Sequence, residues 1–339
     1  MRALLKKLVL LALLVAAFAA AAAGLAWRHF QAFSTATIAV PEDATLIIAR
    51  GDSFVQVLAK VRRAGILEGH DLEWKFLALR MNAMPRLQVG EYALGQALSP
   101  RTLIEKLVRG DVIRYRFTLV EGWSMRDVRA AISRAPVLDD DVAKQSDEAL
   151  MTLIGRKGVP AEGRFLPETY TFVRGDSASH VLEQAADAMD RAVAEAWSSR
   201  SAEVPLRSPQ ELLTLASIIE KETGQASERP EIAGVFSRRM KIGMRLQTDP
   251  TVIYGLGAAF DGNLRRRDLQ TDTPFNTYTR FGLPPTPIAM PGAAALRAAA
   301  NPLDGDTLYF VARGDGHHVF SKTYAEHQQA VRRYQLGQR

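Results

Sequence analysis

Two carboxylates near the end of one predicted helix are the residues best suited to acid–base chemistry. The helix lies within residues 208–224, where Ser208 is a predicted N-cap, Glu211 completes a capping box, and Gly224 ends the helix. Apolar residues recur there at helical spacing and predict a buried stripe formed by Leu212, Leu215, Ala216 and Ile219. Glu220 and Glu222 both flank this stripe.

The two carboxylates differ in the residues that lie one helical turn before them. Glu222 stacks over Ile218 and Ile219, whereas Glu220 stacks over an alanine and a serine. Glu222 is therefore the better candidate for a carboxyl group in water-poor surroundings, with a pKa raised toward that of a general acid. Taken alone, the helix is equally compatible with two solvated carboxylates at a helix end.

Polar, sharply turning segments follow this helix and predict a binding cleft. A second helix is expected over residues 227–240. Beyond it the chain is dense in Gln, Asp, Asn, Tyr, Gly and Pro over 245–255, 276–278, 282–285 and 287–292. We expect these segments to be loops, because such residues favour turns and present polar groups to a ligand.

Motifs in this region resemble the endolytic murein transglycosylases, the YceG-like family. The resemblance rests on A-S-I-I-E-K-E-T at 216–223, R-L-Q-T-D-P-T-V-I-Y-G at 245–255, N-T-Y at 276–278 and G-L-P-P at 282–285. It extends more weakly over almost the whole chain. It implies that the second glutamate of the E-K-E triplet, Glu222, is catalytic.

The implied reaction cleaves a glycosidic bond with one carboxyl group. Such cleavage needs a proton for the leaving oxygen and stabilisation of positive charge at the anomeric carbon. In a lytic transglycosylase the N-acetyl group of the substrate supplies the stabilisation and its own 6-hydroxyl attacks, which leaves a 1,6-anhydro ring. We hypothesise that Glu222 is first the acid and then the base.

The expected substrate-binding residues are Gln247, Asp249, Asn276 and Tyr278, with Glu220 in support. The resemblance also implies that the segment containing Glu168 borders the cleft. From spacing alone, however, Glu168 is a carboxylate at a turn or strand end.

Two other functions stay open. A water-using muramidase would need a second carboxylate, supplied by Glu220, Asp249 or Glu168. A chain without catalytic activity would instead be a membrane-anchored, wall-binding adaptor.

Composition limits the chemistry further. The 339 residues include no cysteine, which excludes disulfides and a cysteine nucleophile. The formal charge of +6 suits a membrane surface or an anionic wall, and scattered basic residues argue against nucleic acid as a partner. The adjacent His317 and His318 lack a carboxylate at ligand spacing, so we expect neither a metal nor another cofactor.

The N-terminal residues predict a membrane anchor. An uncharged run over residues 8–27 matches the bilayer thickness and follows Arg2, Lys6 and Lys7. These basic residues place segment 1–7 in the cytoplasm and the remainder of this single-pass protein outside the inner (plasma) membrane, in the periplasm. A cleaved signal peptide is the alternative, although Trp27 sits where an interface aromatic residue is expected.

The remaining chain predicts an α+β protein with two domains. Residues 28–41 form a tether, and 42–110 combine strands near 45–49 and 90–94 with three helices. This part resembles the LysM-like module of the family, which implies contact with glycan, but it could equally be a spacer. Residues 111–339 form the YceG-like catalytic domain, with a helix over 178–199, a hairpin over 308–320 and a last helix near 324–336. The resemblance also implies partnership with peptidoglycan synthases.

Overall fold

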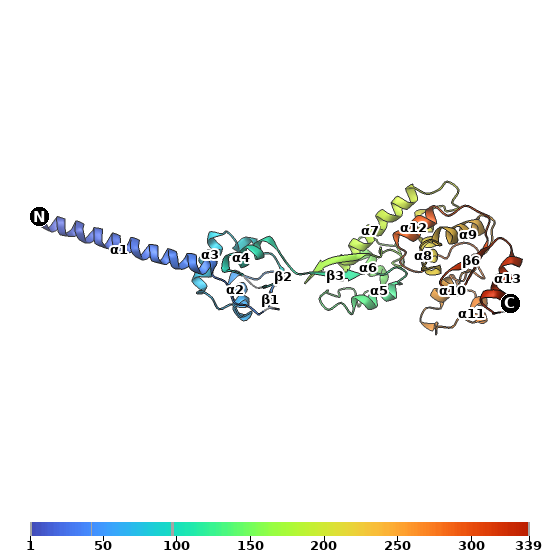
Figure 1. Ribbon diagram of the computed structural model, residues 1–339, viewed down its shortest axis with the longest axis horizontal. Helices are drawn as coiled ribbons and strands as arrows, with labels where there is room; N and C mark the ends of the chain where they lie inside the picture. Colours follow the sequence, from blue (N-terminus) through green and yellow to red (C-terminus); the bar gives the residue numbers. More distant parts are fainter. Residues whose placement is uncertain (1, 42, 96–97, 338–339) are drawn as a thin grey trace. The chain divides into compact units, whose positions relative to one another are not determined.

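The computed structural model describes residues 2–41, 43–95 and 98–337 (Figure 1). Residue 42, where the small module was predicted to begin, lies outside this range. The chain forms two compact units: unit 1 is Met1–Tyr115 with Val173–Gly175, and unit 2 is Arg116–Phe172 with Asp176–Arg339. Helices predominate, and the strands of the described residues pair in two-stranded sheets, β1 with β2, β3 with β4 and β5 with β6. This mixture of helices and small sheets is consistent with the predicted α+β class.

Unit 1 begins with a long helix, α1 (Arg2–Thr35), which is long and apolar enough to cross a membrane. It continues through residues 28–35, which were predicted to belong to a tether. The physical reason is burial: Phe30 and Phe33, one helical turn apart, pack into the core of unit 1, and Ile38 follows them. The end of α1 is therefore part of the folded unit.

In the remainder of unit 1, two strands that are separated in the sequence by two helices pair with each other. Its elements are β1 (Thr45–Ile48), α2 (Phe54–Arg63), α3 (Asp71–Arg80), the short helix η1 (Met84–Arg86), β2 (Gly90–Ala93) and α4 (Pro100–Arg109). The strands are antiparallel, with Thr45 opposite Ala93 and Ile48 opposite Gly90. Ser53 and Ser99 cap α2 and α4 as predicted, so local sequence signals define both helix starts.

Helix α8 (Pro209–Glu222) is the centre of unit 2. Every residue from 212 to 219 is buried, so the predicted single apolar stripe is too narrow. The neighbours of α8 are α7 (Ala178–Ser198), α9 (Arg229–Lys241), α10 (Asp249–Leu256) and α12 (Ala293–Ala300). A helix enclosed in this way is expected to be largely apolar on all sides, and the buried hydroxyls of Thr214 and Ser217 donate to carbonyls of the same helix.

Both ends of α8 differ from their prediction. Ser208 accepts a hydrogen bond from the Glu211 amide at 3.2 Å, but the Glu211 carboxylate accepts from the Arg207 amide at 2.7 Å, so the predicted capping box does not close on Ser208. At the other end Thr223 is extended, with φ −145°, and Gly224 does not adopt the left-handed conformation of a helix-ending glycine. Glu222 is consequently the last helical residue.

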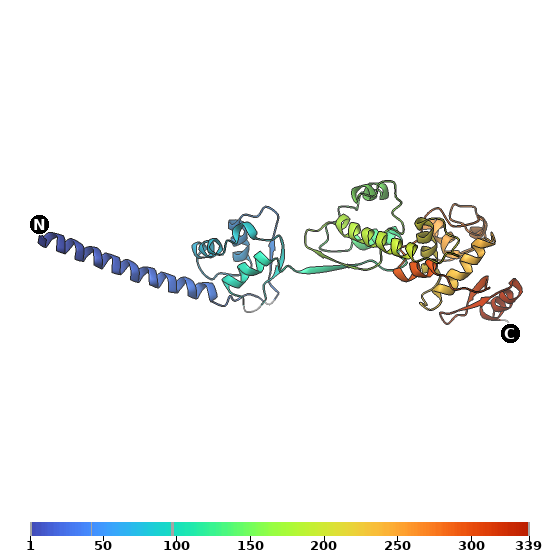
Figure 2. The ribbon, with the colours of Figure 1, turned by 90° about the horizontal axis from the view of Figure 1, so that it is seen from above.

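Further elements of unit 2 frame α8. These are α5 (Met125–Ile132), α6 (Asp147–Leu153), η2 (Gly257–Ala259) and α11 (Arg266–Gln270), with β3 (Arg114–Thr118) and β4 (Thr169–Val173) divided between the two units. The predicted hairpin is confirmed: β5 (Tyr309–Ala312) pairs with β6 (His318–Ser321), and α13 (Tyr324–Tyr334) follows. Figure 2 shows β5, β6 and α13 grouped beside the C-terminus. The segment 245–255, predicted as loop, contains α10, and the alanine-rich α12 was not predicted.

Packing of α9 gives a test of this core. A Cβ at Gly234 would lie 2.4 Å from the carbonyl oxygen of Leu303, which is held by the Arg238 guanidinium at 3.0 Å. In an unobstructed helix alanine would be favoured over glycine by about 1 kcal/mol. We expect Gly234→Ala instead to lower the free energy of unfolding by about 1–3 kcal/mol, measured by urea denaturation.

The matched control is Gly224→Ala, because a Cβ at Gly224 would meet no atom within 4 Å. Equal stability of the two alanine variants would contradict the packing of α9 against the segment around Leu303.

Candidate active site

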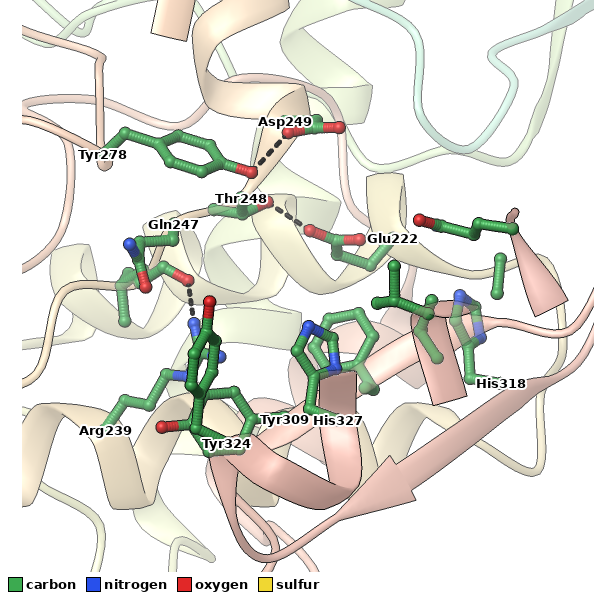
Figure 3. A pocket seen from close by; sticks show the side chains of 16 residues that line it. Glu222, Arg239, Gln247, Thr248, Asp249, Tyr278, Tyr309, His318, Tyr324 and His327 are labelled. Atoms are coloured by element: carbon green, nitrogen blue, oxygen red, sulfur yellow. Dashed lines mark hydrogen bonds between the residues drawn. The ribbon is translucent and has the colours of Figure 1, made fainter. Parts of the chain in front are cut away.

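Glu222 faces a cleft of about 460 Å³ in unit 2 (Figure 3). Three parts of the chain form its walls: the end of α8, the segment 246–249 with Tyr278, and the group of β5, β6 and α13. The cleft is thus assembled from segments far apart in the sequence around the last residue of the central helix. Its volume is within the range of ligand sites, about 300–1,000 Å³.

The Glu222 carboxyl group accepts a hydrogen bond from the Thr248 hydroxyl. The pKa of Glu222 is raised to about 7: burial is the largest cause and the negative charge of Asp249 acts in the same direction, while the Thr248 hydrogen bond and the Arg239 charge act against them. A carboxyl group with this pKa holds its proton in a substantial fraction of molecules at neutral pH. It can therefore donate a proton and accept one again.

Glu220 is also buried, contrary to the predicted contrast with Glu222, but its charge is compensated. Its side chain is only 4% exposed; one carboxylate oxygen lies 3.1 Å from the Arg229 guanidinium, and the other accepts from the Gly292 amide at 2.9 Å. Arg229 also lies 3.4 Å from Glu121. A counter-ion, rather than a difference in burial, separates the two carboxylates. Glu220 does not line the Glu222 cleft.

Asp249 and Tyr278 lie together on the cleft wall, as the sequence predicted for two binding residues. The Tyr278 hydroxyl donates to Asp249 Oδ1 at 2.6 Å. Burial, followed by this hydrogen bond and the Asp249 charge, raises the pKa of Tyr278 well above its ordinary value. Tyr278 is consequently a neutral hydroxyl group at physiological pH.

Gln247 lines the cleft in a strained backbone conformation. Its φ is +51°, a left-handed value that residues other than glycine rarely adopt. Its amide donates to the Thr277 carbonyl at 3.2 Å, and the next residue, Thr248, is buried. Such strain costs on the order of 1 kcal/mol and clusters at functional sites. Here it turns the Gln247 side chain into the cleft while Thr248 reaches Glu222.

Asn276 is not on the cleft surface. Its side chain is 1% exposed, and its amide nitrogen donates to three backbone carbonyls, those of Asp268, Leu269 and Thr271. Its oxygen accepts from the Tyr278 amide at 2.8 Å. Asn276 therefore positions Tyr278 and closes its own loop.

Glu168 is likewise outside the cleft. It is exposed and directly precedes β4, and its carbonyl accepts from the Leu119 amide at 3.0 Å. The buried carboxyl group of this segment is Glu162, whose pKa burial raises to about 7. Glu162 accepts from the Met125 amide and the Tyr254 hydroxyl, both at 3.1 Å, so it caps the start of α5 beside a separate cavity of about 650 Å³.

Several cleft residues were missed by sequence reasoning, because each comes from an element that packs against α8 only in the folded chain. The buried Arg239 donates to the Leu308 carbonyl at 2.7 Å and to the Leu246 carbonyl at 2.6 Å, which joins two cleft walls. Tyr309 and His327 stack with ring centroids 5.2 Å apart. They form an aromatic wall facing Glu222 (Figure 3).

The adjacent histidines of the hairpin are held by one carboxylate. Glu228 accepts from His317 Nδ1 at 3.0 Å and lies 2.8 Å from His318 Nδ1, which sets the His318 ring at the cleft edge. Within residues 2–41, 43–95 and 98–337, no cluster of three or more His, Asp or Glu residues could hold a metal ion.

The long apolar N-terminal helix fits a single-pass membrane anchor, and unit 2 contains a cleft lined by a carboxyl group, Glu222, whose raised pKa suits proton transfer. The chain belongs to the YceG-like family, whose family model matches residues 46–333. The residues that carried the resemblance in the sequence lie within this match.

Named relatives agree with this assignment. A Bacillus subtilis protein named endolytic murein transglycosylase is 34% identical over 73% of this chain and 73% of its own length. A Streptococcus pneumoniae protein of the same name is 26% identical over 79% of this chain, and the match spans 54% of that longer protein. A crystal structure of a yceG-like protein from Listeria monocytogenes has a TM-score of 0.55 and 30% identity, and the match covers 84% of this chain and 97% of that one.

The raised pKa of Glu222 predicts a pH-dependent stability. The folded protein keeps a proton that the unfolded chain loses above about pH 4.5, so the free energy of unfolding falls as pH rises toward about 7. Glu222→Gln should remove a decline on the order of 2 kcal/mol between pH 5 and pH 8, measured by urea denaturation. The decline due to Glu162 should remain.

The control is Glu168→Gln, the same substitution at an exposed position, which keeps Glu222 and should therefore keep the decline. A Glu222→Gln profile identical to wild type would mean that Glu222 titrates like a solvated carboxylate.

Proposed function

We propose that this protein is an endolytic peptidoglycan lytic transglycosylase. It cleaves the β-1,4 bond between N-acetylmuramic acid and N-acetylglucosamine within nascent glycan strands and leaves a 1,6-anhydro-N-acetylmuramic acid end. The observation that carries the proposal is Glu222, a carboxyl group with a pKa of about 7 in an open cleft. The names of the relatives support the same activity.

The proposed reaction moves one proton out and back. Glu222 donates its proton to the glycosidic oxygen as the bond to the anomeric carbon breaks, and the N-acetyl carbonyl of the same sugar stabilises the positive charge. The 6-hydroxyl then attacks the anomeric carbon and returns its proton to the Glu222 carboxylate. The Thr248 hydroxyl and the Arg239 charge stabilise Glu222 in its ionised stage. No water is consumed.

The supporting residues take different parts in this proposal. Gln247, Asp249 and Tyr278 contact the sugar from the cleft wall, since all three line it. Asn276 acts through Tyr278, and Glu220 acts by fixing the last turn of α8 against Arg229. Glu168 does not line the cleft, so its position gives no support to a binding role.

A water-using muramidase is the second candidate function, and one observation favours it. Of the three carboxylates considered as a second catalytic group, Asp249 lines the cleft, whereas Glu220 and Glu168 do not. Such an enzyme would use Asp249 to activate water or to attack the sugar. The products separate the two reactions.

We place this activity outside the plasma membrane. Helix α1 would cross the bilayer once, with the N-terminus in the cytoplasm and the catalytic domain, residues 111–339, in the periplasm. Residues 42–110 would be a LysM-like module, an idea supported by the strand–helix–helix–strand order of β1, α2, α3 and β2. An enzyme held there meets new glycan strands as they form, which makes peptidoglycan synthases its expected partners.

The deciding experiment is product analysis with purified glycan strands. The wild type should release fragments with anhydro ends, which are one water lighter than hydrolysis products. Glu222→Gln should lower the rate by at least about 10²-fold, because the proton donor is lost, while the cooperative unfolding transition is kept.

Two matched variants sharpen the result. Glu220→Gln should weaken the ion pair with Arg229, so it should lower the stability and reduce the rate less than Glu222→Gln does. Asp249→Asn should still release anhydro-ended fragments of the same mass as those from the wild type. Fragments carrying an added water would reject the lytic reaction. Anhydro products from Glu222→Gln at the wild-type rate would reject the catalytic assignment.

A further inference from the structure

Helix α3 of unit 1 is apolar on two faces, one buried in the core of the unit and the other largely exposed. Trp74, Leu77 and Ala78 are buried in the core of unit 1. Outside the core, Leu72 and Leu79 are 76% and 65% exposed, and Phe76 is 49% exposed. These three residues follow the i, i+4, i+7 spacing of one helix face. A helix on a water-facing surface normally carries polar side chains at such positions.

The exposed face of α3 lies beside the end of α1. The Arg80 guanidinium lies 4.4 Å from the centre of the Trp27 ring, and the Phe76 ring lies 4.9 Å from that of Phe30. Further back along α3, Glu73 is 3.2 Å from His29, and Trp74 packs on Phe33. The two helices therefore run in roughly opposite directions, and the C-terminal end of α3 is the end nearest to Trp27.

Trp27 closes the uncharged run of α1, so it gives the level of the membrane interface. With a rise of about 1.5 Å per residue, Phe30 lies roughly 4.5 Å beyond Trp27 along α1. The headgroup region on each side of a bilayer is about 5–8 Å thick, because the hydrocarbon core is about 30 Å of a total of about 40–45 Å. Phe76, in contact with Phe30, and Leu79, one helical turn closer to Trp27, fall at this level.

The charged residues at the two ends of α3 are also arranged relative to Trp27. Its acidic residues, Asp71 and Glu73, are in the first turn, away from Trp27, and Arg80 is in the last turn. Arg28 adjoins Trp27 on α1. Basic residues beside exposed apolar ones at the interface match anionic lipid headgroups.

We propose that the exposed face of α3 (Leu72, Phe76 and Leu79) docks on the phospholipid bilayer, with Phe76 and Leu79 at the boundary between headgroups and acyl chains. Unit 1 is then held to the membrane by two elements, the spanning helix α1 and the interfacial helix α3. This inference rests on the proposed membrane anchor. It assigns α3 a lipid partner that the catalytic reaction does not require.

The absence of cysteine from the chain makes a direct test possible. Single variants Leu79→Cys, Leu72→Cys and Val55→Cys, each in the full chain, would carry a nitroxide spin label in nanodiscs that contain zwitterionic and anionic phospholipids. Val55 is the matched control, because it is 61% exposed on α2. The measurement is the ratio of collision rates with oxygen, which enters lipid, to those with a water-soluble nickel complex.

The label at 79 should give a ratio severalfold higher than the label at 55, with the label at 72 between them. A ratio at 79 equal to that at 55 would overturn the proposed docking on lipid. The exposed face of α3 would then be assigned to a protein partner that is absent from the nanodisc.

A fourth label, from Leu14→Cys in α1, distinguishes a failure of the proposed docking from a failure of the proposed membrane anchor. A lipid-embedded label at 14 with an aqueous label at 79 rejects the docking alone, whereas an aqueous label at 14 rejects both. Glycan cleavage by the same preparations reports separately on the proposed reaction.

Discussion

Charge compensation at the end of α8 is the constraint on which the site depends. The last turn of this helix contains two largely buried carboxyl groups, and the groups that contact them differ. The Glu220 carboxylate pairs with the Arg229 guanidinium and accepts a hydrogen bond from the Gly292 amide, so its charge has a counter-ion. Within the described residues, the donor that reaches Glu222 is the Thr248 hydroxyl, and burial is the main reason that the pKa of Glu222 is raised to about 7. A hydroxyl in place of a counter-ion thus accompanies a pKa suited to the proton donor that we propose.

This difference requires α8 to be held in place, because a displacement would separate Glu220 from Arg229 and Glu222 from Thr248. The helix is buried on all sides from residue 212 to 219, and the alanines of α12 let that helix approach closely. Ser217 adds a fixed point: its hydroxyl donates to the Thr214 carbonyl at 2.7 Å and accepts from the Ile288 amide at 3.0 Å. Arg239 and the Glu228–histidine contacts then attach the hairpin wall to this core.

Local signals in the sequence predicted many of the helices and strands and singled out Glu222 as the candidate acid, whereas contacts between distant segments could not be predicted from them. Ser53, Ser99 and Ser208 cap helices as predicted, because an N-cap acts on amides only a few residues away. Asn276 seemed a ligand-binding residue because nothing local shows that three carbonyls enclose its amide. The counter-ion of Glu220 and the aromatic wall of Tyr309 and His327 depend equally on tertiary packing.

The place of Asp249 favours the one-carboxylate reaction over hydrolysis. Asp249 raises the pKa of Glu222 through its negative charge, so it helps to keep the proton on the acid only while it is itself ionised. A base that removed a proton from water would lose that charge during the reaction, and a nucleophile would lose it by forming a covalent bond. The Tyr278 hydroxyl already occupies Asp249 Oδ1 at 2.6 Å. As a fixed charge, Asp249 would instead favour the second transfer, in which Glu222 regains its proton, and the sugar's own hydroxyl makes a second catalytic carboxylate unnecessary.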